Sequence, residues 1–171
     1  MAKLKKKNEL IIVRHAKSSW KHPELSDFER PLNKRGKRDA PFMGEKLSDK
    51  NVSPDLILAS PAKRAFITAK IISEKVKYPA DKIAFNKNIY EASVNDLLKI
   101  INDIDEHRKS VMLVGHNPGL TSLNNFLTNR FIDNIPTCGI VSIIFNCKWQ
   151  EVDEASGEVD YFIYPKLFLN E

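Results

Sequence analysis

The chain has 171 residues, of which 42% are hydrophobic and 29% are charged. This length allows one domain of ordinary size to bury a sizeable core without disulfides or a structural metal, and this balance of residue types excludes a disordered chain. The formal net charge is +5, and part of the excess lies in a leading run of lysines, so we expect a single domain over residues 1–171 whose residues 1–8 form a basic, mobile tail.

The first apolar run, Leu10 to Val13, is much shorter than the apolar region of a signal peptide, and an arginine follows it directly. We therefore expect neither export nor membrane insertion, and we predict a cytoplasmic protein. Cys138 and Cys147 have neither metal-ligand nor redox spacing, so we interpret them as buried free thiols.

Short apolar runs alternate along the chain with segments of helical spacing. Most of the apolar runs lack polar alternation, which indicates strands buried on both faces of a sheet. The pattern predicts an α/β fold, a three-layer α/β/α sandwich with a mostly parallel central sheet. The expected strands are residues 10–13, 56–59, 111–114, 140–145 and 161–164. The expected helices are residues 36–47, 61–76, 96–104 and 118–127.

Three helix starts are marked by capping residues. Ser60 and Asn117 each stand directly before a proline, which predicts a capping side chain followed by proline at the first helical position. Asn33 is a candidate cap for the helix expected at 36–47. The polar stretch at 148–158 predicts a hairpin-like connection between the last two strands.

In an open α/β sheet, residues just past the carboxyl ends of the strands converge on one crevice, where ligands bind. Arg14 and His15 follow the first expected strand directly. Arg64 lies in the first helical turn after the second strand, and His116 follows the strand at 111–114. The sequence therefore predicts two arginines and two histidines at one crevice.

The residue types at this crevice suit a phosphoryl group. Guanidinium groups are planar and permanently charged, and they match the oxygens of a phosphoryl group in transfer, so Arg14 and Arg64 are candidate binding residues. Helix starts near Ser60 and Asn117 would add backbone N–H groups and the positive ends of helix dipoles. A site with this chemistry binds an anion.

Two histidines and a carboxylate are candidates for the chemical steps. Imidazole is a competent nucleophile near neutral pH, so His15 is the candidate nucleophile, and His116 is the candidate hydrogen-bond donor to the phosphoryl oxygens. Glu91 follows a weaker apolar stretch that we interpret as a further strand. It is the candidate that protonates the leaving atom and then activates water; a salt bridge at the rim is the alternative interpretation.

Five segments of this sequence carry a resemblance to a known family. They are LIIVRHAKSSW at 10–20, ERPLNKRG at 29–36, LILASPAKRAFITA at 56–69, YEAS at 90–93 and LVGHNPGL at 113–120. In this order they resemble the histidine phosphatase superfamily, which includes the phosphoglycerate mutases, and most closely its small SixA-type phosphohistidine phosphatases. The resemblance spans Leu10 to about Ile144. It implies a phosphoglycerate mutase-like fold.

The same resemblance implies roles for individual residues. His15 would carry the phosphoryl group, and Glu91 would be the proton donor. The residues that would hold the phosphoryl oxygens are Arg14, Arg64 and His116.

Details of the sequence differ from most members of that superfamily. Ala16 stands where most have glycine, although small relatives also carry alanine, so the backbone there lacks a glycine's conformational freedom. Lys17 and Ser18 follow, where mutases usually have an acidic residue and a serine, and both are candidate binding residues. The segments between the motifs leave no room for the large lid insertion of mutases and bisphosphatases, which implies an open site.

We therefore predict a phosphatase that uses neither a metal nor a cofactor and forms a phosphohistidine on His15. An open site suits phosphorylated protein or small phosphoesters, and protein phosphohistidine is the favoured substrate. A small-metabolite phosphatase of the same mechanism and a non-catalytic phosphate-binding module are alternatives. A metal site is disfavoured because His15 and His116 have no helix-spaced partner and no carboxylate cluster.

Other features point to simpler roles. Nucleic-acid binding is disfavoured because the tryptophans and tyrosines do not interleave with the basic residues. His22 and His107 stand among polar and charged neighbours, so we interpret them as solvated surface groups. Trp20 and Phe28 either line the mouth of the crevice or pack within the protein. The sequence leaves the oligomeric state open.

Overall fold

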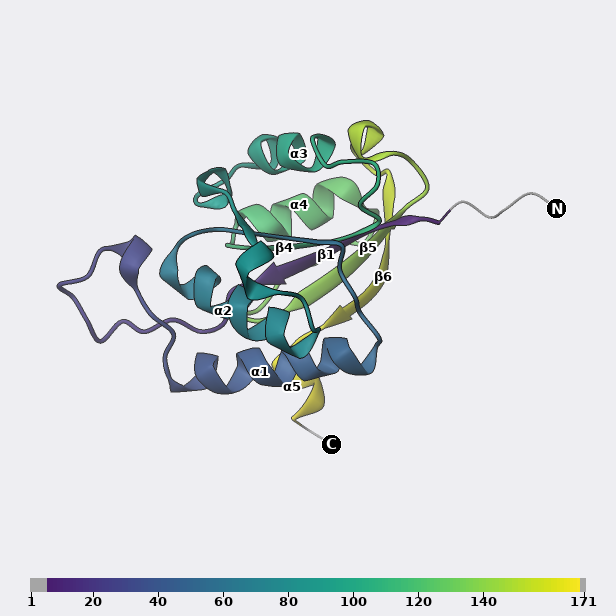
Figure 1. Cartoon of the computed structure of the whole chain (residues 1–171). Helices are drawn as coiled ribbons and strands as arrows, with labels where there is room; N and C mark the ends of the chain where they lie inside the picture. Colours follow the sequence, from purple (N-terminus) through teal and green to yellow (C-terminus); the bar gives the residue numbers. More distant parts are fainter. Residues whose placement is uncertain (1–5, 170–171) are drawn as a thin grey trace.

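The computed structural model describes residues 6–169, which contain one six-stranded sheet (Figure 1). The strands are β1 (Asn8–Arg14), β2 (Leu56–Ala59), β3 (Ala84–Phe85), β4 (Ser110–Gly115), β5 (Ile140–Phe145) and β6 (Gly157–Ile163). They lie in the order β3-β2-β4-β1-β5-β6. Neighbours among β1 to β4 pair in parallel, whereas β5 runs antiparallel to β1 and β6. The sheet is therefore mostly parallel, as expected.

Helices cover both faces of this sheet. The α-helices are α1 (Lys34–Asp49), α2 (Lys63–Lys75), α3 (Val94–Asn102), α4 (Gly119–Leu127) and α5 (Pro165–Phe168). Short 3-10 helices lie in the connections: η1 (Asp27–Glu29), η2 (Ala80–Lys82), η3 (Lys87–Ile89) and η4 (Trp149–Glu151). α3 and α4 lie on one face, and α1, α2 and α5 lie on the other (Figure 1). The predicted three-layer fold is confirmed, and the described chain has no large insertion between these elements.

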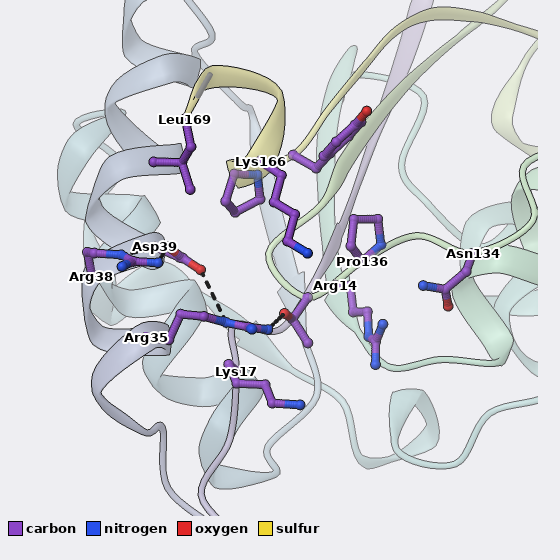
Figure 2. Close-up of a pocket in the computed structure, with 12 residues that line it drawn as sticks. Arg14, Lys17, Arg35, Arg38, Asp39, Asn134, Pro136, Lys166 and Leu169 are labelled. Atoms are coloured by element: carbon purple, nitrogen blue, oxygen red, sulfur yellow. Dashed lines mark hydrogen bonds and ion pairs between the residues drawn. The ribbon is translucent and has the colours of Figure 1, made fainter. Parts of the chain in front are cut away.

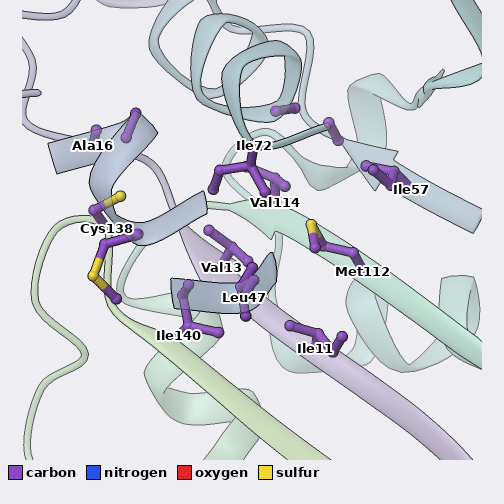
Figure 3. Close-up of a cluster of buried hydrophobic side chains, with 14 of the residues drawn as sticks. Ile11, Val13, Ala16, Leu47, Ile57, Ile72, Met112, Val114, Cys138 and Ile140 are labelled. Carbon is purple, nitrogen blue, oxygen red and sulfur yellow. The ribbon is translucent and has the colours of Figure 1, made fainter. Parts of the chain in front are cut away.

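Successive residues of the central strand β1 fill two separate cores. Ile11 and Val13 belong to the cluster on the side of α1 and α2, whereas Leu10 and Ile12 belong to the cluster on the side of α3 and α4. All four side chains are fully buried. Figure 3 shows the first cluster, with Leu47 of α1 among the strand residues. The strand sequence therefore lacks polar alternation because both faces of the sheet are buried.

The expected strands and helices are all present, and their ends differ from the prediction by a few residues. The connection at 146–156 joins the antiparallel strands β5 and β6, as expected of a hairpin. Asn33 caps α1, because its side chain accepts a hydrogen bond from the backbone N–H of Gly36 at 2.9 Å.

The predicted positions of two prolines are wrong. α2 begins two residues beyond Pro61, and Pro118 is the N-cap residue of α4 rather than its first helical residue. The side chain of Ser60 accepts the backbone N–H two residues further on, at 3.2 Å, and thereby forms a turn before the helix. Asn117 accepts the N–H four residues further on, at 3.2 Å. Both polar side chains bond to the backbone at the helix starts, but they precede the N-cap position.

The segment before Glu91 is not the further strand that the sequence suggested. The edge strand β3 ends at Phe85, and the side chain of Asn86 accepts the N–H of Asn88 at 2.9 Å. This bond starts the 3-10 helix η3 instead of extending the strand. Glu91 therefore follows a helical turn in a connection.

Several simpler expectations concern the ends of the chain and the surface. The prediction that residue 8 belongs to a mobile tail is wrong, because β1 begins at Asn8, which is buried. Residues 1–5 of the predicted tail lie outside the described part of the chain. Cys138 is buried and Cys147 is half-buried, and both are free thiols. His22 and His107 are exposed, as expected. In the described residues, no helix has the length and apolar character needed to cross a membrane.

Candidate active site

A cavity of about 650 Å³ lies where β1 and β4 end. Every residue that the sequence singled out for binding or chemistry lines it, namely Arg14, His15, Lys17, Ser18, Arg64, Glu91 and His116. These residues come from separate connections of the chain. They meet because parallel pairing brings the carboxyl ends of β1, β2 and β4 to the same edge of the sheet.

His15 follows β1 directly and is only 7% exposed. Its Nδ1 lies 2.7 Å from the carbonyl oxygen of Ala16. A carbonyl oxygen only accepts, so Nδ1 carries the proton and Nε2 keeps its lone pair. Burial, reinforced by the nearby His116, Arg64 and Arg14 and opposed by the bond to Ala16, lowers the pKa of His15 to about 3. The ring is therefore neutral at physiological pH.

The ring of His116 lies next to that of His15, with 5.2 Å between the ring centroids and an angle of 54° between the ring planes. Its Nε2 lies 2.7 Å from Oγ of Ser60, which is fully buried. Burial, followed by the positive charge of Arg64, lowers the pKa of His116 to about 4. Ser60 thus holds the second histidine in place, a role that reasoning from the sequence did not assign to it.

Hydrogen bonds connect the end of β1 and the loop after it to α2 and to the segment before β5. Nη1 of Arg14 donates to the carbonyl oxygen of Ile135 at 2.8 Å. Oγ1 of Thr68 accepts the backbone N–H of Ala16 at 3.0 Å and donates to the carbonyl oxygen of Arg64 at 2.7 Å. Ala16 is not among the residues with positive φ. The loop therefore does not need glycine at this position, which explains how alanine is accommodated.

The same loop passes closely over the start of α1. The carbonyl oxygen of Lys17 accepts the N–H of Asn33 at 3.0 Å, and a Cβ atom on Gly36 would overlap that carbonyl group. The glycine of the ERPLNKRG segment is thus needed for a close approach of two backbones. The hydroxyl of Ser18 accepts a hydrogen bond from Nη1 of Arg30 at 2.8 Å.

Arg64 is only 5% exposed, and Asp27 holds its guanidinium group. Its Nη2 lies 2.9 Å from Oδ2 of Asp27, and its Nη1 donates to the backbone oxygen of Asp27 at 2.6 Å. The hydroxyl of Tyr90 donates to the same Oδ2 at 2.6 Å, and Nε of Arg30 donates to Oδ1 at 3.1 Å. The bond from Tyr90, together with Arg64 and Arg30, outweighs burial and lowers the pKa of Asp27 to about 2.

Reasoning from the sequence missed Asp27, Arg30 and Tyr90 as parts of this site. Arg30 and Tyr90 belong to two of the segments that carry the family resemblance, which is the signal that could have found them. Trp20 is 73% exposed and lines the cavity, with the guanidinium carbon of Arg30 3.6 Å from its ring centroid. Trp20 therefore belongs to the mouth of the cavity and not to the core.

Glu91 is exposed and lines the cavity. Its backbone has φ 55°, a left-handed conformation that costs a residue with a side chain roughly 1 kcal/mol. The capped helix α3 begins shortly after it, where Ser93 and Asp96 form a capping box. The carboxylate of Glu91 therefore lies at the rim of the cavity. The elements on either side, η3 and α3, set the backbone conformation of Glu91.

The arrangement suits an anion that reacts with a neutral imidazole. Positive side chains line the cavity around His15. Three buried nitrogen atoms of the lining residues have no hydrogen-bond partner within residues 6–169, namely Nε of Arg14, Nε of Arg64 and Nδ1 of His116. Among the described residues, no three histidine, cysteine or acidic side chains are grouped to hold a metal ion.

Comparisons with known proteins agree with this geometry. Residues 10–110 match the model of the histidine phosphatase superfamily, branch 1. An uncharacterised chloroplastic protein of Arabidopsis thaliana is 32% identical over 157 residues, which are 86% of this chain and 72% of that protein. A mitochondrial serine/threonine-protein phosphatase of Drosophila ananassae is 37% identical over 82 residues, which are 48% of this chain and 28% of that protein.

A solved structure extends the comparison to almost the whole fold. The protein histidine phosphatase SixA, complexed with tungstate, superposes with a TM-score of 0.81 at 20% sequence identity. The superposition covers 93% of this chain and 98% of that chain. The two proteins therefore share a fold, and the expected phosphoglycerate mutase-like architecture without a large lid is confirmed.

Proposed function

Because this chain belongs to branch 1 of the histidine phosphatase superfamily, we propose that it is a metal-independent phosphatase that forms a phosphohistidine on His15. The observation that carries the proposal is the state of His15, a buried neutral ring whose Nδ1 is fixed by the carbonyl oxygen of Ala16. A lone pair on Nε2 is what a nucleophile requires. The positive charges of Arg14 and Arg64 stand around it to bind the phosphoryl oxygens.

The first step transfers the phosphoryl group from substrate to enzyme. Nε2 of His15 attacks phosphorus, a new N–P bond forms, and the P–O or P–N bond to the leaving group breaks. Glu91 gives its proton to the leaving atom, while Arg14, Arg64 and His116 hold the oxygens on which negative charge is spread.

The second step returns the enzyme to its starting state. Glu91, now ionised, takes a proton from a water molecule as that water attacks phosphorus. The N–P bond breaks, its electron pair returns to Nε2, and inorganic phosphate leaves with the oxygen of the water. Both His15 and Glu91 then have the protons with which they began.

Protein phosphohistidine is the substrate we favour. The cavity is open and has no large lid within the described chain, so a phosphoryl group carried on a protein can reach His15. The shared fold with the protein histidine phosphatase SixA supports this choice. Hydrolysis of a phosphate ester is the second candidate, and the similarity to a serine/threonine-protein phosphatase favours it. Both substrates pass through the same intermediate.

The proposal is tested with 4-nitrophenyl phosphate in the presence of EDTA. We expect turnover by the wild type, and rapid quench at alkaline pH should trap an acid-labile phosphoryl group on the protein. His15→Ala should abolish both, whereas His107→Ala, which changes an exposed histidine outside the cavity, should abolish neither. Turnover that EDTA removes, or a phosphoryl group that persists in His15→Ala, would refute the mechanism.

A further inference from the structure

A second cavity adjoins the active site, on the side of α1 and α5 (Figure 2). Its volume is about 350 Å³. Arg14, Lys17 and Thr137 line both this cavity and the active-site cavity. The two cavities therefore adjoin along these residues, which are all that a ligand with its phosphoryl group at His15 would have to pass to reach the second cavity.

Positive side chains dominate the second cavity, which we name the basic pocket. In Figure 2, Lys166 extends from α5 toward Arg14 and Arg35, which lie on the other side of the pocket. The charged residues that line it, and by which we define it, are Arg14, Lys17, Arg35, Arg38, Lys166 and Asp39. Five cationic groups thus stand against one carboxylate.

Asp39 does not neutralise this charge. It is buried and lies 3.2 Å from Nη2 of Arg38 and 3.9 Å from Nε of Arg35, so its single charge is shared between two arginines. Within residues 6–169, no carboxylate lies within 4.0 Å of Lys17 or Lys166 in an ion pair. The pocket therefore keeps an excess of positive charge.

One arginine of the pocket is oriented toward the active site. Nη2 of Arg35 donates to Oγ1 of Thr137 at 3.2 Å, and Thr137 belongs to the wall that the two cavities share (Figure 2). This bond holds the Arg35 guanidinium against a residue that lines both cavities. Guanidinium and ammonium groups in such a position bind carboxylates and phosphates.

We propose that the basic pocket binds a second anionic group, a carboxylate or a phosphate, on the same molecule whose phosphoryl group reacts at His15. The inference rests on the proposed phosphatase function and restricts its substrates to molecules with more than one anionic group. Two sources supply this chemistry: an acidic residue close to the phosphohistidine of a phosphoprotein, and the second phosphate of a small bisphosphate.

Two matched pairs of substrates test the inference and separate the sources. The first pair is a phosphohistidine peptide with glutamates on both sides and the same peptide with glutamines. The second pair is 1,4-butanediol bisphosphate and the corresponding monophosphate. An exposed charge pair contributes roughly 0.2–1 kcal/mol, or about 1.5- to 5-fold. Several cations together should therefore raise kcat/KM for the more acidic member about fivefold to twentyfold at low salt, and less at high salt.

The pair that shows the preference identifies the source of the anionic group, and a preference in both pairs supports the inference for both. The double variant Arg38→Gln, Lys166→Gln removes two of the five cationic groups and should reduce the preference by about half or more. Each single variant should give an intermediate preference, which keeps the test decisive if the double variant does not fold. Lys37→Gln changes a neighbouring exposed residue of α1 outside the pocket and should leave the preference intact.

The outcomes distinguish this inference from the proposed function. Equal kcat/KM within both pairs, or a preference that is undiminished in the double variant, would overturn the basic pocket as a binding site. If the wild type still turns over 4-nitrophenyl phosphate in that case, the phosphatase function stands without the pocket. Loss of turnover on every substrate would instead reject the proposed function.

Discussion

The carboxylate of Asp27 lies 2.9 Å from Nη2 of Arg64, inside the cavity where we propose that a phosphoryl group binds. The hydrogen bond from Tyr90 and the bonds from the two arginines lower the pKa of Asp27 to about 2, so the carboxylate is ionised at neutral pH. A bound phosphoryl group must share Arg64 with this second anion. Asp27 therefore positions Arg64 and at the same time weakens anion binding.

Asp27→Asn should tighten competitive inhibition by inorganic phosphate. The substitution keeps the size of the side chain but removes the negative charge that repels phosphate and competes for Arg64. Because the Asp27 side chain is 48% exposed, solvent screens the repulsion, and we expect the inhibition constant to fall by about two- to fivefold. Glu29→Gln removes a negative charge from the same 3-10 helix outside the cavity and should leave the constant unchanged. Weaker inhibition in Asp27→Asn would contradict this account.

The two buried histidines should make the protein less stable in mild acid. Burial lowers the pKa from 6.5 to about 3 for His15 and about 4 for His116. Below about pH 6.5 the two histidines therefore bind protons in the unfolded chain but not in the folded protein. The free energy of unfolding falls as the pH decreases toward the pKa values of the folded protein. Between about pH 7 and pH 5, each histidine should lower the free energy of unfolding by about 2 kcal/mol.

Urea unfolding at these two pH values measures the effect. His15→Gln should reduce the difference between the two free energies of unfolding by about 2 kcal/mol, whatever it does to stability at neutral pH. The matched control is His107→Gln, because the His107 ring is 92% exposed and folding changes its solvation little. A pH dependence that is the same in wild type and His15→Gln would show that the ring of His15 is charged or solvated in the folded protein.

Gly36→Ala should destabilise the protein and disturb the active site together. The new methyl group would overlap the carbonyl group of Lys17, so the loop that carries His15 must shift. Overpacking of this kind costs roughly 1–3 kcal/mol, and we expect kcat/KM for 4-nitrophenyl phosphate to fall as well. Thermal unfolding and steady-state kinetics check both effects.

Gly44→Ala is the matched control on the same helix. Its methyl group would lie 2.8 Å from Cγ and 2.9 Å from Cβ of Lys75, which are close to the backbone of α2, so α1 and α2 must move apart slightly. The preference of alanine over glycine in a helix, about 1 kcal/mol, offsets part of this cost. The contact lies away from the loop that carries His15, so this variant should lose stability but keep its kcat/KM. An equal loss of kcat/KM in both variants would mean that the close approach of Gly36 to Lys17 has no special importance for the active site.

Most of the fold could be predicted because both faces of the sheet are buried. The strands are therefore continuous apolar runs in the sequence and differ clearly from the polar connections. The sequence also predicted where Arg14, His15 and His116 lie, because parallel strands end at one edge of the sheet and each residue directly follows a strand. These inferences need only local patterns and one topological rule. They depend little on where individual side chains point.

The sequence did not predict contacts that depend on folded loops. Asp27 reaches Arg64 across 37 positions and Tyr90 across 63, and no periodic pattern links residues so far apart. Glu91 was expected after a strand, but β3 is only two residues long and the side chain of Asn86 redirects the chain into η3. The sequence did not predict the basic pocket either, because Lys166 is far along the chain from the other cationic residues of the pocket.

Glu91→Gln should separate substrates by their leaving groups. Glutamine keeps the size of the side chain and can adopt the same backbone conformation, but it has no proton to give. An alkyl phosphate leaves as a strongly basic alkoxide that needs this proton, so kcat/KM should fall by about 100-fold. 4-Nitrophenolate leaves without protonation, so transfer from 4-nitrophenyl phosphate to His15 should fall by less than about tenfold. Single-turnover kinetics measure the first step separately from hydrolysis of the phosphohistidine. Equal losses on both substrates would instead assign Glu91 a role in binding, at the rim where its exposed carboxylate stands.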